Sequence, residues 1–271
     1  MYNPLVRQYW SLIEGQTRLK NRYKQLVEII FPEFNLIFND SYDDLALNFI
    51  HDFLHPVLFV NRRIDYLMNY LKEKNGTTQA YRFKNKALKM KELASNSLCF
   101  VCFDSYQVQN LVQTIEMIQY HKSEINKIKN QLISEMKDKK LFKIINSIPG
   151  FGEFSTALFL AEVGDIIRFD DKYQFISFIG IDSVTSQSGV SDYHCPISKT
   201  GCKFGRTILF NVVTTIIQIS ARVDETNPIY LFFRKKQSEG KHHYKCIIAC
   251  ETKLCKIIYK LCPSNCLYEN K

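Results

Sequence analysis

Apolar residues recur every three or four positions along most of this chain, a spacing that predicts α-helices. The longest pattern runs from about 106 to 146 and predicts the stripe of a coiled coil or long hairpin arm. Its members are Val108, Val112, Ile115, Ile118, Ile125, Ile128, Leu132 and Met136. The polar His121 and Lys122 fill the gap between Ile118 and Ile125. The stripe is expected either to pack against the chain's own helices or to form a dimer.

Shorter helical patterns flank this stripe. They cover about 4–32, 44–54, 56–73, 79–98, 141–164 around a turn, 172–179, 203–222, 228–238 and 243–261. No segment sustains the alternation of a strand, and residues 181–200 are expected to form a polar loop. Glycine and proline, at 10 and 7 of 271 residues, are too scarce for many short strands and turns. The predicted fold is therefore mainly α.

Three regions are expected along the chain. Residues 1–103 form a helical N-terminal region, 104–140 a coiled-coil arm, and 141–262 a C-terminal helical domain with a helix-hairpin-helix-like element.

That element centres on the sequence SIPGFG, Ser147 to Gly152. Pro149 cannot continue a helix, and Gly150 and Gly152 accept positive φ. In a helix-hairpin-helix, backbone amides of such a turn meet a nucleic-acid phosphate, aided by the positive end of the second helix. An ordinary helix–helix turn is the alternative interpretation.

The expected loop at 181–200 carries the candidate nucleophile. Ser188 precedes the permissive Gly189, and a hydroxyl in such a place suits attack on a phosphate. An ordinary loop serine is the alternative. Ser198 is expected to cap the following helix, while His194 and Cys195 have no partner spacing that would make them a base and a thiol nucleophile.

Basic side chains gather after this loop. Lys199, Lys203 and Arg206 are candidate phosphate ligands, although Arg206 could instead pair with an acid. Further on, Arg234, Lys235 and Lys241 lie in a basic cluster interleaved with aromatic residues, which suits phosphate tracking with base stacking. The alternative for this cluster is a solvated helix face.

The overall charge points the same way. Lysine and arginine outnumber aspartate and glutamate by 36 to 27, a net charge of +9 that favours a polyanionic partner. The alternative is a merely basic protein.

No apolar run of membrane-spanning length and no signal peptide are found, so the chain is expected to be cytoplasmic with nine reduced cysteines. Cys99 and Cys102 form a CxxC without a second pair, and the C-terminal cysteines at 246–266 are expected to be buried small hydrophobes.

Acidic residues offer a weak candidate metal site. Asp40, Asp43 and Asp44 could hold Mg²⁺, but no further acid on a strand accompanies them, so charge at a helix N-terminus is the favoured role. We therefore predict that this chain binds no cofactor.

From about Leu141 to Lys260 the sequence resembles the C-terminal domain of insertion-sequence one-ten family transposases, which are bridge-RNA-guided recombinases. The resemblance is carried by SIPGFG, by SQSG, by ISKTGCKFGR and by the basic cluster with the apolar stretch that follows it. It implies that Ser188 is the nucleophile of a serine–DNA phosphate link and that Lys199 and Arg206 face phosphates. It also implies DNA, a structured noncoding RNA and a homo-oligomer as partners.

The family also has an N-terminal DEDD nuclease domain that holds Mg²⁺ beside the serine. Its strand-borne acids are not found here, so Mg²⁺ is implied only for that domain and the chain is expected to be N-terminally truncated. The leading prediction is DNA transposition or site-specific recombination. A non-catalytic nucleic-acid-binding remnant is the alternative, and a structural coiled-coil protein is a weaker third reading.

Overall fold

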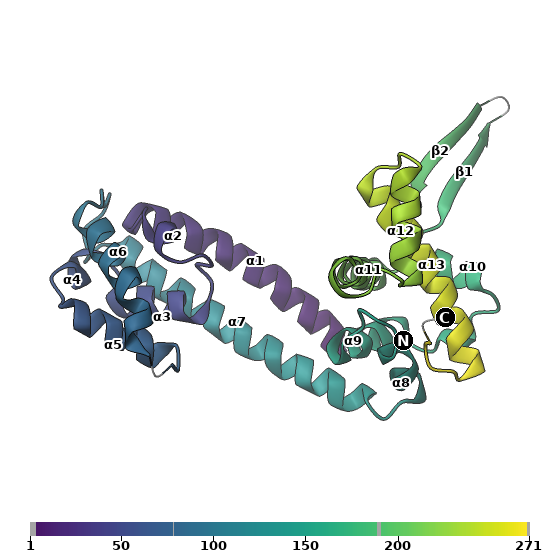
Figure 1. Ribbon diagram of the computed structural model, residues 1–271, viewed down its shortest axis with the longest axis horizontal. Helices are drawn as coiled ribbons and strands as arrows, with labels where there is room; N and C mark the ends of the chain where they lie inside the picture. The colour runs from purple at the N-terminus through teal and green to yellow at the C-terminus, as the bar shows by residue number, and fades with distance from the viewer. Residues whose placement is uncertain (1–3, 78, 189–190, 270–271) are drawn as a thin grey trace. The chain divides into compact units, whose positions relative to one another are not determined.

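The computed structural model describes residues 4–77, 79–188 and 191–269, and it divides the chain into two compact units. One unit is Trp10–Asn126, and the other combines Met1–Tyr9 with Lys127–Lys271. Helices make up most of both units, which confirms the predicted mainly α fold (Figure 1). The three-region division of the chain stays a prediction.

The unit Trp10–Asn126 has an aromatic core. Its helices are α1 (Pro4–Ile30, from Trp10 onward), α2 (Phe34–Ile37), α3 (Asp44–Phe53), α4 (Val57–Val60), α5 (Ile64–Lys74), the 3₁₀ turn η1 (Ala80–Phe83), α6 (Lys84–Ser95) and α7 (Tyr106–Met136, up to Asn126). Phe31, Phe34, Phe49 and Phe59 are almost completely buried and meet edge-to-face or tilted. Such ring pairs add to the stability that their burial supplies.

Within this unit, α1 and α7 run antiparallel. Arg22 on α1 donates to Asn110 Oδ1 on α7 at 2.8 Å, and the His121 ring lies 3.3 Å from the Leu12 carbonyl oxygen. Gly15 permits the approach, because a Cβ there would lie 2.9 Å from His121 Cε1. His121, one of the two polar residues that interrupt the α7 stripe, thus lies at a contact between α1 and α7.

The apolar stripe of α7 is buried within the chain. All its predicted members except the half-buried Val112 are at most 5% exposed. This burial favours packing against the chain's own helices, and the predicted homo-oligomer through this stripe stays a proposal. The helix ends at Met136, earlier than the predicted 146, because the polar residues 137–139 interrupt the apolar pattern before α8 (Lys140–Asn146) begins.

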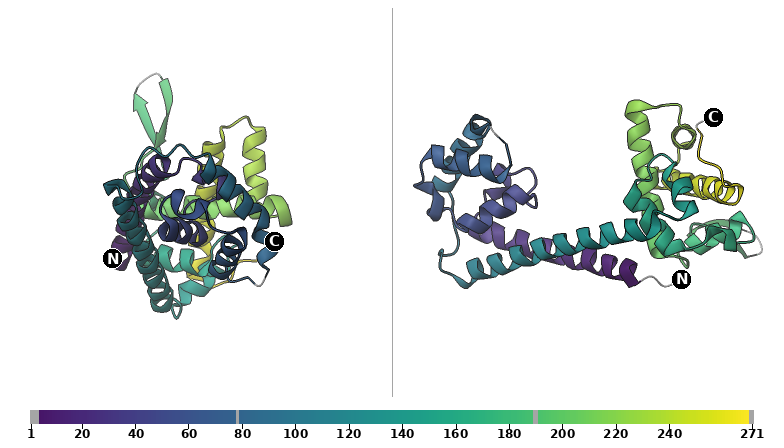
Figure 2. Two further views of the ribbon diagram at one scale, coloured as in Figure 1. Left: turned by 90° about the vertical axis from the view of Figure 1, so that its left-hand side faces the viewer. Right: turned by 90° about the horizontal axis from the view of Figure 1, so that it is seen from below.

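The second unit is built around helix α11. It contains α8, α9 (Glu153–Val163), the 3₁₀ turn η2 (Ile166–Arg168), α10 (Lys172–Ile179), β1 (Ser183–Ser188), β2 (Ser191–Ile197), α11 (Lys203–Val223), α12 (Pro228–Ser238) and α13 (His243–Ser264). One face of α11 packs against α9, α12 and α13 (Figures 1 and 2). Asp171 caps α10 by accepting from the backbone N–H groups of Tyr173 and Gln174.

The prediction of a polar loop at 181–200 is wrong, because most of this segment forms an antiparallel β-hairpin. Ser183 pairs with Ile197 and Ser188 pairs with Ser191. Figure 1 shows the two strands projecting from the helices of their unit. The sequence signal for the strands is weak: β1 is almost entirely polar, and the short alternation of Tyr193, Cys195 and Ile197 in β2 is interrupted by Pro196, a residue that central strands avoid.

By length and composition, α11 could cross a membrane, and 39% of its most apolar 18-residue window is buried. A buried core helix meets the same criteria, and the packing of α11 against α9, α10, α12 and α13 favours that role. On α13, Cys246, Cys250, Cys255 and Cys262 are buried as expected. Cys266 is exposed, so the prediction is wrong for that residue.

Candidate nucleic-acid interface

The residues that follow β2 pair with those that precede β1, which closes the foot of the hairpin. Backbone N–H groups of Ser198, Lys199 and Cys202 donate to the carbonyl oxygens of Asp182, Gly180 and Phe178 at 3.0, 3.2 and 2.7 Å. The Ser198 hydroxyl also donates to Asp182 Oδ1 at 2.5 Å. Ser198 therefore fastens the strand ends together and does not cap α11, contrary to the sequence-based expectation.

Two glycines make this close pairing possible. Gly180 ends α10 with φ +77°, in the left-handed region. A Cβ on Gly201 would lie 2.2 Å from the Phe178 carbonyl oxygen, which is the oxygen that accepts from Cys202. Glycine is thus required at 201 by a backbone approach.

Arg206 is used inside the fold. Its guanidinium donates to the carbonyl oxygens of Ile179 at 2.8 Å and Gly180 at 3.4 Å, at the C-terminal end of α10. A cation at that end also compensates the partial negative charge of the helix. The predicted phosphate contact of Arg206 therefore competes with a structural role.

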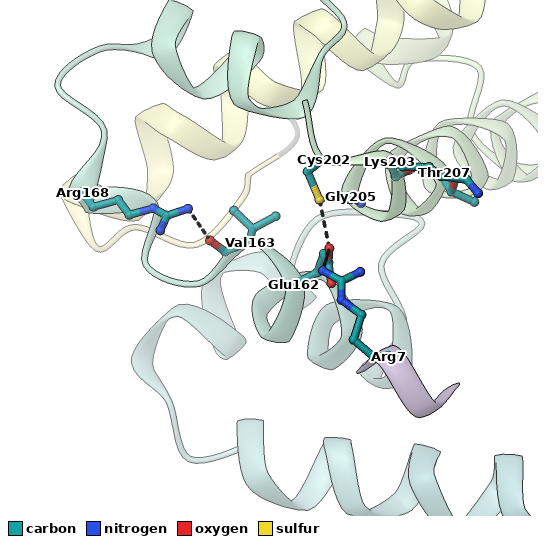
Figure 3. A network of polar contacts seen from close by, with 8 residues as sticks. All are labelled: Arg7, Glu162, Val163, Arg168, Cys202, Lys203, Gly205 and Thr207. Carbon is teal, nitrogen blue, oxygen red and sulfur yellow. Dashed lines mark hydrogen bonds and ion pairs between the residues drawn. The ribbon is translucent and has the colours of Figure 1, made fainter. Parts of the chain in front are cut away.

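Cys202 caps α11 in place of Ser198. Its Sγ accepts from the Gly205 N–H at 3.2 Å and donates to Glu162 Oε1 at 3.2 Å, and Arg7 pairs with the same oxygen at 3.0 Å (Figure 3). Burial, reinforced by Glu162, raises the pKa of the Cys202 thiol to about 11. Cys202 is therefore a neutral thiol at pH 7 that links α11 to α9.

Ser188 is the last residue of β1, and its side chain lies outside the described part of the structure. It lies five residues along β1 from Ser183 at the foot, which corresponds to roughly 16 Å at the usual rise of a strand. The predicted cations do not accompany it: Lys199 is exposed at the foot with φ +54°, and Lys203 is exposed at the first turn of α11. The described residues thus place Ser188 at one end of the hairpin and the basic residues at the other.

The turn between α8 and α9 has a packing explanation for one of its glycines. Gly150 has φ +88°, and a Cβ there would lie 2.5 Å from Ile216 Cγ1 and 2.9 Å from the Val212 carbonyl oxygen on α11. Gly152 begins α9 with room for a Cβ, and it is exposed, as is Pro149. Phosphate contact at this turn stays a prediction.

The charge at this end of α9 does not favour an anion. Glu153 lies in the first helical turn, and Lys137 pairs with it at 3.5 Å. A phosphate at the same N–H groups would meet the Glu153 carboxylate, which already compensates the helix dipole.

The C-terminal basic cluster is exposed. Arg234 and Lys235 on α12 are both exposed, with no ion pair to the described residues. Lys241 instead pairs with Glu239 at 3.2 Å, and Lys236 pairs with the same carboxylate at 2.8 Å. Arg234 and Lys235 are consequently the two cations of α12 that are best placed to meet a polyanion.

The acidic residues near 40–44 have structural roles. Asp43 caps α3 by accepting from the Asp44 N–H, Asp44 pairs with Lys122 at 2.7 Å, and Asp40 accepts from the Tyr42 N–H. This confirms the favoured role of charge at a helix N-terminus. Across residues 4–77, 79–188 and 191–269, no group of three or more histidine, cysteine, aspartate or glutamate side chains that could hold a metal ion is found.

One buried acid was missed in the sequence. Glu251 lies on the inner face of α13 with Ile247, Leu254 and Ile258, and it is 1% exposed. The spacing of 247, 251, 254 and 258 is that of a core stripe, so a charged residue at 251 was the available signal.

Residues 142–227 match the Transposase IS116/IS110/IS902 family. The match covers about a third of the chain, so the likeness to these transposases is shown for that segment. No curated protein matches the chain.

The matched segment begins within α8 and ends at the residue before α12. It contains the whole hairpin and its foot. The predicted site residues inside it are Pro149, Gly150, Gly152, Ser188, Lys199, Lys203 and Arg206. Arg234, Lys235 and Lys241 follow it.

Proposed function

We infer that this chain is a DNA-binding insertion-sequence transposase in which Ser188 forms a covalent link to a DNA phosphate. The observation that carries the proposal is a hairpin, inside the segment that matches transposases, with a rigidly bonded foot and Ser188 at its far end. A projecting pair of strands suits a group that must reach a phosphodiester bound outside the helical body.

The proposed step is a transesterification. Ser188 Oγ forms a bond to phosphorus, and one bond between phosphorus and a deoxyribose oxygen breaks. The proton that leaves Oγ is balanced by protonation of the departing deoxyribose oxygen. Because one phosphodiester replaces another, strand exchange can reverse the step without an external energy source.

Nucleic-acid binding is assigned to the exposed cations. Arg234, Lys235, Lys199 and Lys203 contact phosphates. By the resemblance to the one-ten family, a structured noncoding RNA and further copies of the chain take part. The proposed location is the cytoplasm.

A second function, nucleic-acid binding without chemistry, is favoured by one observation. The described cations lie near the foot of the hairpin, roughly 16 Å along the strand from Ser188. Attack without charge stabilisation at the phosphate would be slow.

Trapping of an adduct distinguishes the two functions. The full chain is incubated with end-labelled DNA from the flanks of its gene, with and without RNA transcribed from them, and resolved on a denaturing gel. We expect a protein–DNA adduct from the wild type and from Ser191→Ala, whose position pairs with Ser188 across the hairpin, but none from Ser188→Ala. An adduct that persists in Ser188→Ala would show that Ser188 is not the nucleophile. Salt-dependent binding without any adduct would support the second function.

A further inference from the structure

A small pocket opens beside the hairpin foot, between the end of β2 and helices α11 and α13. It holds about 260 Å³, below the range of drug-sized sites and closer to the size of a single planar ring. Its walls include the rings of Phe210 and Tyr244 and the side chain of Ile197, and its polar groups include Arg206 and Glu251. The transposase chemistry proposed for Ser188 does not use this pocket.

Glu251 lines the pocket but has no hydrogen-bond partner for its Oε2 atom among the described residues, although that atom is fully buried. A buried carboxyl oxygen without a partner is costly and rare. Burial raises the pKa of Glu251 to about 8, against the opposing charge of Arg206. At neutral pH the side chain is therefore mostly a neutral acid, which can donate one hydrogen bond and accept others.

Aromatic rings form the opposite part of the site. Phe210 and Tyr244 lie nearly parallel, with ring centroids 6.3 Å apart and an interplanar angle of 24°. The His242 ring stacks on Tyr244 at 5.7 Å. Tyr244 is 59% exposed, so it presents ring surface to a ligand. Exposed aromatic rings beside cations are the usual platform for unstacked bases.

We propose that this pocket binds one unpaired nucleobase, which stacks on Tyr244 and hydrogen-bonds through its Watson–Crick edge to the Glu251 carboxyl group. The edge of a base carries adjacent donors and acceptors that complement a carboxylic acid. Lys203 and Lys245, both exposed on the same two helices, are available for the flanking phosphates. The inference rests on the proposed nucleic-acid binding and adds a base-binding site to it.

The test uses single-stranded DNA and RNA oligonucleotides that carry 2-aminopurine, whose fluorescence falls when it stacks. A dye at the strand end reports overall binding by anisotropy. With the full wild-type chain we expect 2-aminopurine quenching on binding, and quenching with DNA alone, RNA alone or both identifies the source of the base. Tyr244→Ala and Glu251→Met are each expected to weaken affinity by about five- to a hundredfold and to abolish the quenching.

The choice of substitution at Glu251 and two control variants keep the result interpretable. Glu251→Met replaces a buried unpaired carboxyl by an apolar side chain of similar length, so loss of folding is not expected. Glu251→Gln keeps a donor and an acceptor and should retain the quenching. Tyr173→Ala removes an exposed tyrosine that does not line the pocket and should bind as the wild type does.

The outcomes separate the two proposals. Anisotropy changes without quenching, or quenching that Tyr244→Ala and Glu251→Met leave intact, overturn the base pocket while nucleic-acid binding stands. No anisotropy change with either nucleic acid overturns both.

Discussion

Side-chain size at single positions decides how the hairpin is attached. Gly201 lies against the Phe178 carbonyl oxygen so closely that no side chain fits, and Gly180 adopts a backbone conformation that other residues avoid. Gly152, in contrast, has open space where a Cβ would lie. Glycines of similar appearance in the sequence thus carry different constraints.

Gly201→Ala is expected to destabilise the fold by about 2 kcal/mol or more, because either the Cys202–Phe178 hydrogen bond or the α10 end must shift. Denaturant unfolding followed by circular dichroism measures the change. Gly152→Ala is the matched control and should lie within about 0.5 kcal/mol of the wild type. Equal effects of the two substitutions would contradict the steric role of Gly201.

The arrangement of helix α12 and the residues just after it decides which basic side chains are available to a partner. The exposed face of α12 presents Arg234 and Lys235 without ion partners among the described residues, while Glu239 neutralises much of Lys236 and Lys241 just beyond the helix. Glu239 has its pKa lowered by hydrogen bonds from those two lysines, so it stays ionised at neutral pH. Identical residue types in one basic run therefore contribute unequally.

Replacing Arg234 and Lys235 together with alanine should lower the slope of log affinity against log salt concentration by about 2, since each phosphate contact contributes about 0.9. Fluorescence anisotropy with duplex DNA over a salt series measures it. Lys236→Ala, which removes a lysine already paired to Glu239, should change the slope by less. If the double variant leaves the slope unchanged, Arg234 and Lys235 of α12 do not contact the DNA phosphates.

Sequence patterns predicted the helices well and the hairpin not at all. The turn at 148–152, the helix at 172–179 and the α7 stripe follow from periodicity and from glycine and proline placement. The hairpin was missed because backbone hydrogen bonds hold it together: those of the β1–β2 pairing and those at its foot. Backbone hydrogen bonds of this kind leave no pattern of apolar residues in the sequence. Arg206 was recognised as important, but its carbonyl partners on α10 are distant in sequence and left no local signal.

At the scale of the whole molecule, the chain comprises two units that α1 and α7 both enter. The apolar stripe of α7 lies in the interior along its length, which leaves its other faces to carry any contact between copies. Association of the chain on DNA therefore has to be tested separately from the stability of its helices.

Ile115, on α7 and completely buried, provides that test. Ile115→Ala should destabilise the chain by about 2–5 kcal/mol through cavity formation, without changing its molecular mass in light scattering. Met117→Ala, at a half-exposed position on the same helix, should cost far less. If Ile115→Ala instead shifts an oligomer to monomer, the stripe is an intermolecular seam.

The hairpin is held at its foot, and this attachment affects how Ser188, the proposed nucleophile, reaches a phosphate. A lone two-stranded ribbon is only marginally stable by itself, so the orientation of its far end is decided by whatever it touches there. If Ser188 is the nucleophile proposed above, shortening β1 and β2 by one residue pair would leave the melting of the helical body unchanged yet move Ser188 away from the phosphate. On that proposal the hydroxyl is correctly oriented only once the DNA is bound, so the reaction depends on assembly of the complex.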